Sequence, residues 1–549
     1  DSSDFSYINK IYRFLYNFRY ILNMFRRYLK YGLLLGASAG TVASLHNNDY
    51  QLNSFGVVRL SRSVLTAYSI ARTYKRELYA KKWDKSTDEY KNVKKHAHLL
   101  AAEQLLDLCK TNKGVYIKVG QHIGALDLIL PVEYVQTMRV LHKDAPSNSL
   151  DMIYKVLRED LKAEPEELFA EFSEEPLGTA SLAQVHRAVL HDGSVVAVKV
   201  QHHFVRGNVN SDLRTMAALV RLMSWVFPDF QMQWLVDETR RNIVRELDFT
   251  QEGRNAERLA SMFTGYSWLK VPKIYWEHTT PRVLVMEYVN GGQVNDYNYI
   301  KKHKIDPYDL SRKLGDLYSH MIFVNGFVHS DPHPGNILVR RDPADKEVTI
   351  YLLDHGLYAN LTDKFRYDYS QFWLAIIRRD RTAMKRHAEQ LGIMGELYGL
   401  FACMVTGRPW ATILHGIDRS KPDQAEKNQF QSEVPKLIND ISSCLENMDR
   451  QTLLVLKTND LIRSIEFALG THHRMCGFTV MAKCCLMSVN TERYKHATTF
   501  MQRLSSRLER YSTLLWYYIY HGKNKNILHF QKSINAIIYL KTHLNFFFM

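Results

Sequence analysis

A short polar motif between apolar runs is the feature that most constrains this chain of 549 residues. Residues 327–339 read FVHSDPHPGNILV, and residues 351–357 read YLLDHGL. Asp331 and Asn336 therefore stand five positions apart, and Asp354 opens a D-x-G sequence. The apolar runs have the length and composition of strands, so we expect neighbouring strands to bring the three polar side chains to the same edge.

These residue types in this spacing suit a metal site built around phosphate groups. Mg²⁺ prefers hard oxygen ligands and keeps several waters, so one carboxylate and one amide oxygen suffice when phosphates complete the shell. Protein kinases combine a D-x-x-x-x-N catalytic loop with a D-x-G aspartate in this way. Asn336 and Asp354 are thus the candidate metal ligands, and Asp331 is the candidate catalytic base or orienting group. The alternative is that these are ordinary turn residues.

A turn of small residues upstream leads into a strand that carries a lysine. Residues 176–185 read PLGTASLAQV, and residues 195–200, after a turn, read VVAVKV. When Val185 is aligned with the valine that follows a kinase glycine-rich loop, two of the three glycine positions are alanines. Because alanine has less backbone freedom than glycine, we expect this loop to cover phosphates differently from an ordinary kinase. The candidate nucleotide-binding residues here are Gly178, Ala180, Ser181, Ala183, Val185 and Lys199.

Lys199 has two interpretations. In a kinase fold it would bind the α- and β-phosphates and need a carboxylate partner; otherwise it is a structural lysine whose ammonium reaches the surface. The partner candidates are Glu246 and Glu252, which on one helix would point roughly 120° apart and so serve two different cations. The alternative is a solvated acidic helix face. The interval after Lys199 is far longer than the roughly twenty residues of ordinary kinases, which predicts an insertion.

An apolar segment at 114–126 carries the sequence K-x-G-Q at 118–121. Taken alone, it predicts a core helix with a solvated lysine. Together with the alanine-rich loop, E-x-D at 246–248, H-x-D-P-H-P-G-N at 329–336 and D-x-G at 354–356, it resembles the UbiB (AarF-domain) family of atypical kinase-like proteins, and in particular its animal mitochondrial branch. The resemblance runs from about residue 50 to about residue 500.

This resemblance implies a two-lobed α+β protein-kinase-like fold with an N-terminal helical K-x-G-Q extension and a C-terminal helical region. Lys118 would reach into the nucleotide site and pair with Glu246, and Glu252 would pair with Lys199. Gln121 and Asp248 belong to the same two motifs. The implied cofactors are ATP, or another nucleotide, and Mg²⁺.

The implied activity is hydrolysis of ATP or phosphoryl transfer to a small or lipid-related molecule. The alternative is a nucleotide-binding scaffold that does not turn over. Protein kinase activity is disfavoured, because the extension would block peptides and His333 replaces the lysine that kinases carry two places after the catalytic aspartate.

The composition of the chain limits which classes of molecule it is expected to bind. The net charge is +15 with an isoelectric point near 9.3, but no nucleic-acid-binding motif accompanies it. We therefore expect a nucleotide, an anionic or mitochondrial membrane lipid and an unidentified small-molecule or protein partner, and no nucleic acid. The six cysteines show no C-x-x-C spacing, so neither a zinc site nor a disulfide scaffold is indicated.

The first residues favour a mitochondrial, membrane-associated protein. Residues 5–48 contain no acidic side chain, and their lysines and arginines alternate with aromatic and apolar residues. Residues 32–45 are uncharged, with overlapping G-x-x-x-G. At 1.5 Å per residue such a helix spans roughly 21 Å of a roughly 30 Å hydrocarbon core, so a spanning helix at 31–46 and a buried or interfacial helix both remain open.

Residues 284–288 are expected to form a strand, which ends in the glycine hinge at 291–292. In a kinase fold, the backbone groups of Glu287 and Tyr288 would face adenine there.

These markers divide the chain into six parts. We predict a basic targeting and membrane-proximal segment at 1–90, the K-x-G-Q extension at 91–165, a small lobe at 166–290, a large lobe at 291–406, a linker at 407–433 and a C-terminal helical region at 434–549.

Overall fold

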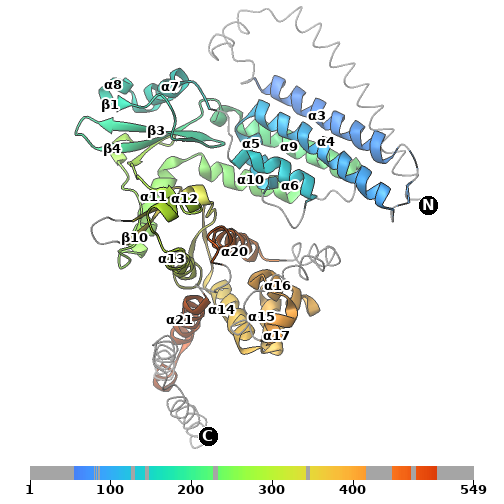
Figure 1. Ribbon diagram of the computed structural model, residues 1–549, viewed down its shortest axis with the longest axis vertical. Helices are drawn as coiled ribbons and strands as arrows, with labels where there is room; N and C mark the ends of the chain where they lie inside the picture. Colours follow the sequence, from blue (N-terminus) through green and yellow to red (C-terminus); the bar gives the residue numbers. More distant parts are fainter. Residues whose placement is uncertain are drawn as a thin grey trace, which may run out of the picture. The chain divides into compact units, whose positions relative to one another are not determined.

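The computed structural model describes residues 55–79, 81, 83–84, 87–124, 130–142, 147–226, 233–341, 347–415, 448–471 and 478–503. Helices and strands both contribute to it, as the predicted α+β class requires (Figure 1). The chain divides into two compact units. The first comprises Asp1–Arg258, Val271–Val289 and Asp354–Leu357, and the second comprises Leu259–Lys270, Asn290–Leu353 and Tyr358–Met549.

The first unit contains an antiparallel sheet in the order β1-β3-β4-β6, with β2 also paired to β3. The predicted hairpin is present, because β3 and β4 pair along their length around a turn in which Gly193 has a φ of +84°. Asp192 Oδ1 accepts the Ser194 N–H in this turn at 2.8 Å. The strands are β1 (Phe169–Phe172), β2 (Gly178–Thr179), β3 (Ala183–Leu190), β4 (Val195–Gln201) and β6 (Val283–Glu287).

A different helix covers each face of this sheet. Successive side chains of a strand point to opposite faces, and β4 follows this rule. Its Val196, Val198 and Val200 pack with α7 (Leu150–Leu161), while Ala197 packs with α11 (Phe249–Met262). Lys199 therefore lies on the α11 face. The short helices α8 (Pro165–Leu168) and η3 (Trp276–His278) complete the sheet-bearing part.

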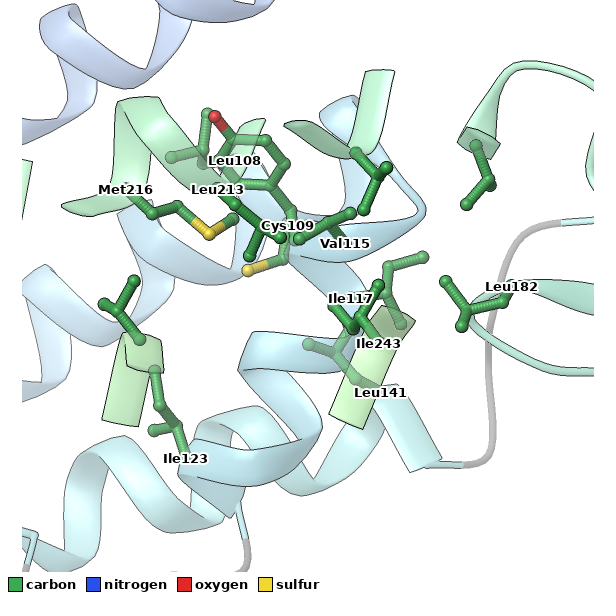
Figure 2. Packing of buried hydrophobic residues seen from close by; sticks show 14 of the residues in the cluster. Leu108, Cys109, Val115, Ile117, Ile123, Leu141, Leu182, Leu213, Met216 and Ile243 are labelled. Carbon is green, nitrogen blue, oxygen red and sulfur yellow. The ribbon is translucent and has the colours of Figure 1, made fainter. Parts of the chain in front are cut away.

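The rest of the first unit is helical. Helices α3 and α4 run side by side (Figure 1), and side chains from α4, α5, α9 and α10 share one buried core. Figure 2 shows Cys109, Ile117, Leu213 and Ile243 in this core, together with Leu182 from the alanine-rich loop. The helices are α3 (Gly56–Leu78), α4 (Asp88–Asn112), α5 (Val115–Gly124), α6 (Val132–Met138), η2 (Arg139–His142), α9 (Val205–Val226) and α10 (Gln233–Glu246).

A buried ion pair fixes α3 to α9 within this helical part. Arg59 Nε donates to Asp212 Oδ1 at 2.9 Å, and the guanidinium also donates to the carbonyl of Asn112. Burial raises the pKa of Asp212, and the Arg59 charge opposes that shift. Helix α3, which lies in the segment predicted at 1–90, is therefore joined both to the segment that follows Lys199 and, through Asn112, to the predicted extension. The segment after Lys199, α9 and α10, is the insertion that the long interval between Lys199 and its glutamate indicated.

The second unit has two small sheets. One runs in the order β5-β10-β9-β7, and the other pairs β11 with β8. The three strands predicted around the polar motif are confirmed as β8, β9 and β10. The strands are β5 (Leu269–Lys270), β7 (Gly292–Gln293), β8 (Phe327–His329), β9 (Ile337–Arg341), β10 (Val348–Leu352) and β11 (Tyr358–Asn360).

Helices form the remainder of the second unit. They are α12 (Tyr297–Lys302), α13 (Pro307–Ser319), the π-helical turn η4 (His320–Asn325), η5 (Pro334–Asn336), α14 (Asp363–Arg378), α15 (Arg381–Gln390), η6 (Gly395–Leu397), α16 (Tyr398–Thr406), α17 (Trp410–His415), α20 (Arg450–Ala468) and α21 (Phe478–His496). Helix α17 begins the region predicted as a linker, and its Ile413 is fully buried, so this part is packed structure. Residues 416–447 lie outside the described residues.

The predicted targeting and membrane segments, residues 1–48 including 31–46, also lie outside the described residues. Within the part of the chain that the structure describes, no helix is both long and apolar enough to cross a membrane.

Candidate functional site

Lys199 lies at the centre of a charged cluster in the first unit. Its Nζ donates to both carboxylate oxygens of Glu252, at 2.7 and 2.9 Å, and lies 3.4 Å from Asp354 Oδ2. Burial by itself would lower the pKa of Lys199, but the charges of Asp354 and Glu252 outweigh burial and raise it. The same burial raises the pKa of Glu252, against the effect of Lys199. The expected pair is thus present, and its lysine stays protonated.

The sheet and α11 together explain this geometry. Phe249 and Ala256 of α11 pack on the sheet face that carries Ala197 and Lys199. Glu252 lies between them in the sequence, one turn from each, and its side chain is buried. The Lys199 ammonium also lies 5.2 Å from the centre of the Phe249 ring. The Lys199 ammonium is held by these buried partners, so Lys199 is not a structural lysine whose ammonium reaches the surface.

The D-x-G sequence is fixed onto α11 through its backbone. The carbonyl of His355 accepts from Asn255 Nδ2 at 3.0 Å, and the His355 N–H donates to Glu252 Oε1 at 3.4 Å. Asp354 Oδ1 accepts the Gly356 N–H at 2.9 Å. The Asp354 side chain nevertheless stays 41% exposed, with its Oδ2 facing the Lys199 ammonium.

The two glutamates of the E-x-D region lie on different helices. Glu246 ends α10 and Glu252 lies in α11, so the two glutamates do not share the one helix for which a separation of roughly 120° was expected. Asp248 lies between them and its Oδ1 accepts from the backbone and the hydroxyl of Thr250, at 3.1 and 2.7 Å. An aspartate in this position satisfies the free N–H groups at a helix start. Asp248 therefore begins α11, and the structure shows no ion-pair role for it among the described residues.

Lys118 of the K-x-G-Q motif binds the first of these glutamates. Its Nζ lies 2.7 Å from Glu246 Oε2, and both side chains are 12% exposed. A Cβ placed on Gly356 would lie 3.8 Å from both Glu246 Cγ and Glu252 Oε2. The glutamate of the Lys118 pair and the glutamate of the Lys199 pair thus both lie beside Gly356, the glycine of D-x-G.

The other two residues of K-x-G-Q join α5 to η2. Gln121 Nε2 donates to the carbonyl of Leu141 at 3.0 Å. A Cβ on Gly120 would lie only 2.3 Å from Leu141 Cδ1. The motif therefore couples one charged contact with a close helix packing that needs glycine.

The alanine-rich loop does not use the backbone freedom of glycine. Gly178, Ala180, Ser181 and Ala183 all lack a positive φ, which explains why alanine is accepted there. The Ala180 N–H donates to the carbonyl of Ala183 at 2.8 Å, and Val185 lies in β3 opposite Gly178. Ser181 is 4% exposed.

His202, which the sequence did not single out, holds this loop from behind. Its Nε2 donates to the carbonyl of Ala180 at 3.1 Å, and its Nδ1 accepts from Asn148 at 2.9 Å. Its backbone N–H donates to the carbonyl of Leu182 at 2.9 Å. Burial lowers the pKa of His202 to about 4, which keeps the ring neutral. A histidine directly after a strand carries no motif signal, so only the structure could identify it.

The predicted adenine-facing groups are already engaged in part. The Glu287 N–H donates to the carbonyl of Lys273 at 2.8 Å, and the Tyr288 N–H donates to the carbonyl of Val195 at 3.2 Å. The Tyr288 bond continues the pairing of β6 with β4 beyond the end of β6, and the Glu287 bond joins the last residue of β6 to Lys273. The amide N–H groups of both residues are therefore engaged within the protein, and it remains a prediction that backbone groups of Glu287 and Tyr288 face adenine.

The second unit holds the catalytic-loop motif. The carbonyl of Asp331 accepts from the His333 N–H at 2.7 Å and from Asn336 Nδ2 at 3.2 Å. His333 Nδ1 accepts the Gly335 N–H at 3.2 Å and so caps the turn η5. These bonds close the loop on itself. The side chain of Asp331 stays 35% exposed, as a group that receives a substrate hydroxyl or water must be.

Asn336 is oriented as a metal ligand would be. Because its Nδ2 donates to the Asp331 carbonyl, its Oδ1 is the amide atom left to bind a cation. Asn336 precedes β9, and its carbonyl accepts the N–H of Leu353, the residue before Asp354. An amide oxygen and a carboxylate are the hard donors that Mg²⁺ requires. Within the described ranges, no group of three or more His, Cys, Asp or Glu side chains could hold a metal ion by itself.

Two residues beside Asp331 were not anticipated. Lys457 of α20 places its Nζ 3.7 Å from Asp331 Oδ1. Tyr318 of α13 is buried, its hydroxyl has no hydrogen-bond partner among the described residues, and burial together with the Asp331 charge raises its pKa. Tyr318 therefore remains protonated and cannot act as a base. Neither residue lies in a motif, so sequence spacing could not have found them.

Comparisons with known proteins identify the family of this chain. A family profile described as the ABC1 atypical kinase-like domain matches residues 140–388. The chain is 56% identical over 505 residues to AarF domain-containing kinase 1 of Drosophila melanogaster, covering 91% of this chain and 97% of that protein. It is 46% identical over 482 residues to AarF domain-containing protein kinase 1 of Gallus gallus, covering 88% and 92%.

A plant protein is also similar. The chain is 36% identical over 475 residues to a putative ABC1 protein of Arabidopsis thaliana, covering 83% of this chain and 87% of that protein. The kinase-like description confirms the predicted two-lobed α+β fold class. The chain belongs to the AarF domain-containing, or ABC1, family of atypical kinase-like proteins.

Proposed function

We propose that this protein binds ATP, or another nucleotide, with Mg²⁺ and transfers the terminal phosphoryl group to water or to a small, lipid-related acceptor. The observation that carries this proposal is the Lys199 cluster. A protonated lysine held at 2.7 Å by a buried glutamate, with an exposed D-x-G aspartate 3.4 Å away, is a site prepared for phosphate and metal.

The residues divide the chemistry between them. Lys199 binds the α- and β-phosphates, with the loop of Gly178, Ala180, Ser181, Ala183 and Val185 covering them. Asn336 and Asp354 are the residues that would hold Mg²⁺, which supplies positive charge against the phosphates when bound. Lys118 stays paired with Glu246 beside the D-x-G glycine, where the extension limits access to small substrates.

Asp331 takes the proton in the proposed transfer. The bond between the terminal phosphorus and its bridging oxygen breaks, and that electron pair stays on the departing diphosphate. A new phosphorus–oxygen bond forms to the acceptor, and the acceptor's proton passes to the Asp331 carboxylate. The exposure of Asp331 and its closed backbone loop support this role.

The test is nucleotide turnover by the full chain, with and without vesicles that contain an anionic mitochondrial lipid. We expect release of phosphate from Mg-ATP, and loss of that release in Asp331→Ala with nucleotide binding retained. Binding without release under every condition would instead make the protein a nucleotide-binding scaffold. Absence of binding would overturn the proposal.

We further infer a mitochondrial, membrane-associated location. The acid-free basic stretch within residues 5–48 supports it, since each lysine or arginine near an anionic surface contributes about 1 kcal/mol of attraction. Deleting residues 1–48 should release the protein from mitochondria. Fractionation tests the compartment and carbonate extraction tests spanning: cytosolic full-length protein would contradict the first, and ready extraction would contradict a spanning helix only.

A further inference from the structure

Helix α20 brings a lysine to the predicted catalytic aspartate. Lys457 Nζ lies 3.7 Å from Asp331 Oδ1, with side chains that are 42% and 35% exposed. Helix α20 lies beyond residues 140–388, the range that the family profile matches. The lysine therefore comes from the C-terminal helical region, for which the motifs assigned no role.

The position of Lys457 is set by the packing of α20. Val455, Leu456 and Thr458, its immediate neighbours, are all buried. Lys457 thus emerges at the edge of the buried face, where its stem starts from fixed backbone.

Contacts of three α20 residues, and of Thr471 three residues beyond its end, hold this helix within the second unit. Gln451 Oε1 accepts the Thr362 N–H at 2.7 Å, near the start of the helix. Asn459 Nδ2 donates to the Tyr369 hydroxyl at 3.1 Å, two residues after Lys457. The other two contacts are those of Arg463 with the carbonyls of Met404 and Val405, both at 3.1 Å, and of Thr471 with the Ser311 hydroxyl at 2.6 Å.

The catalytic loop itself lacks a lysine at the usual place. Position 333 holds a histidine whose Nδ1 accepts the Gly335 N–H, so its ring serves the turn. Phosphoryl transfer requires positive charge on the oxygens of the moving group, which kinases and related enzymes supply with lysine, arginine or metal ions. An acceptor bonded to Asp331 lies within about 3 Å of it, so the attacked phosphoryl group arrives within reach of a flexible ammonium held 3.7 Å from the same carboxylate.

We infer that Lys457 binds the terminal phosphate of the nucleotide and acts as the catalytic-loop lysine, supplied from a distant helix. This inference rests on the proposed function, and it adds a residue and a role for the C-terminal region. Because an exposed ion pair stabilises a fold little, loss of the Lys457–Asp331 contact should leave the protein folded.

The experiment compares Lys457→Met with Lys457→Arg and with Lys385→Met as the matched control. Lys385 is 43% exposed and lies 2.8 Å from Glu396, so it loses a similar surface ion pair far from the loop in sequence. Calorimetry measures the Mg²⁺-dependent dissociation constants of ADP and of a non-hydrolysable ATP analogue with an imido bridge. Thermal unfolding of each variant checks the fold, and phosphate release is measured in parallel.

We expect Lys457→Met to weaken binding of the ATP analogue about tenfold and to leave ADP binding unchanged, as the loss of one charge-assisted contact to the terminal phosphate predicts. Lys457→Arg should retain most of the affinity, and Lys385→Met should match the wild type. Equal affinities in Lys457→Met and Lys385→Met, or an equal loss for ADP, would overturn the inference while the proposed function stands. A wild type that binds neither nucleotide would refute the proposed function and this inference with it.

Discussion

Glu246 and Glu252 stand six positions apart, yet they lie on two successive helices and each binds a different lysine. The break between the helices is short, and Asp248 caps the second one through Thr250. One short segment therefore places the glutamate that contacts Lys118 and the glutamate that contacts Lys199 beside the same glycine, Gly356.

The Lys118–Glu246 pair should be strongly coupled. Both side chains are 12% exposed, so removing one partner leaves a poorly solvated charge. A double-mutant cycle with Lys118→Met and Glu246→Gln, followed by urea unfolding, should give a coupling free energy of about 1–3 kcal/mol. A value below about 0.5 kcal/mol would mean that the pair behaves as an exposed surface contact.

Gly120→Ala should destabilise the first unit. The new Cβ would lie 2.3 Å from Leu141 Cδ1, and Leu141 is itself fully buried, so it cannot swing into solvent. Overpacking of this kind costs about 1–3 kcal/mol, which exceeds the roughly 1 kcal/mol that alanine gains over glycine in a helix. Gly178→Ala is the control, because nothing lies within 4 Å of its new Cβ. Thermal unfolding of both variants decides, and equal melting temperatures would contradict the close packing.

Stability should fall on acidification because of His202. Its folded pKa of about 4 lies below the unfolded value of 6.5, so the unfolded chain takes up a proton first. The contribution of His202 is complete above pH 6.5 and is lost as the pH falls towards 4, by about 3 kcal/mol in total. Nearby Lys113 acts in the same direction, since its charge also disfavours a protonated ring.

Denaturation curves of the wild type and His202→Gln check this dependence. Between pH 6.5 and pH 5 the wild type should lose about 2 kcal/mol more than the variant, whose amide does not titrate. Burial also lowers the pKa of His98 and His186, so the difference between the two proteins, rather than either curve, isolates His202. Parallel curves would show that this ring is not the titrating group.

Asp354→Ala should abolish Mg²⁺-dependent nucleotide binding while the protein stays folded. Asp354 is 41% exposed and packs against no core, but it supplies one of the two predicted metal ligands. Lys199 keeps its two contacts with Glu252 in the variant, so the buried pair remains intact. Calorimetry with Mg-ATP tests the assignment, and an unchanged affinity would reject Asp354 as a ligand.

Patterns of neighbouring residues in the sequence predicted the strands around the polar motif and the strand that carries the lysine. Strand-like runs flanked the polar motif and became β8, β9 and β10, and the apolar run that carries Lys199 became β4. Glu246 and Glu252 each lie beside a different lysine, on two helices rather than on one. Spacing along a strand or helix is short-range geometry, so a sequence can express it directly.

Tertiary structure alone decided how the distant pieces combine. The sequence by itself determined which side chains are available: a strand lysine, the aspartate and asparagine of the D-x-x-x-x-N motif and a D-x-G aspartate. Only packing decided that His202 holds the alanine-rich loop, that the amides of Glu287 and Tyr288 are engaged, and that Lys457 reaches Asp331. These contacts join residues far apart in the chain, and their positions depend on how buried faces fit together, which no local spacing encodes.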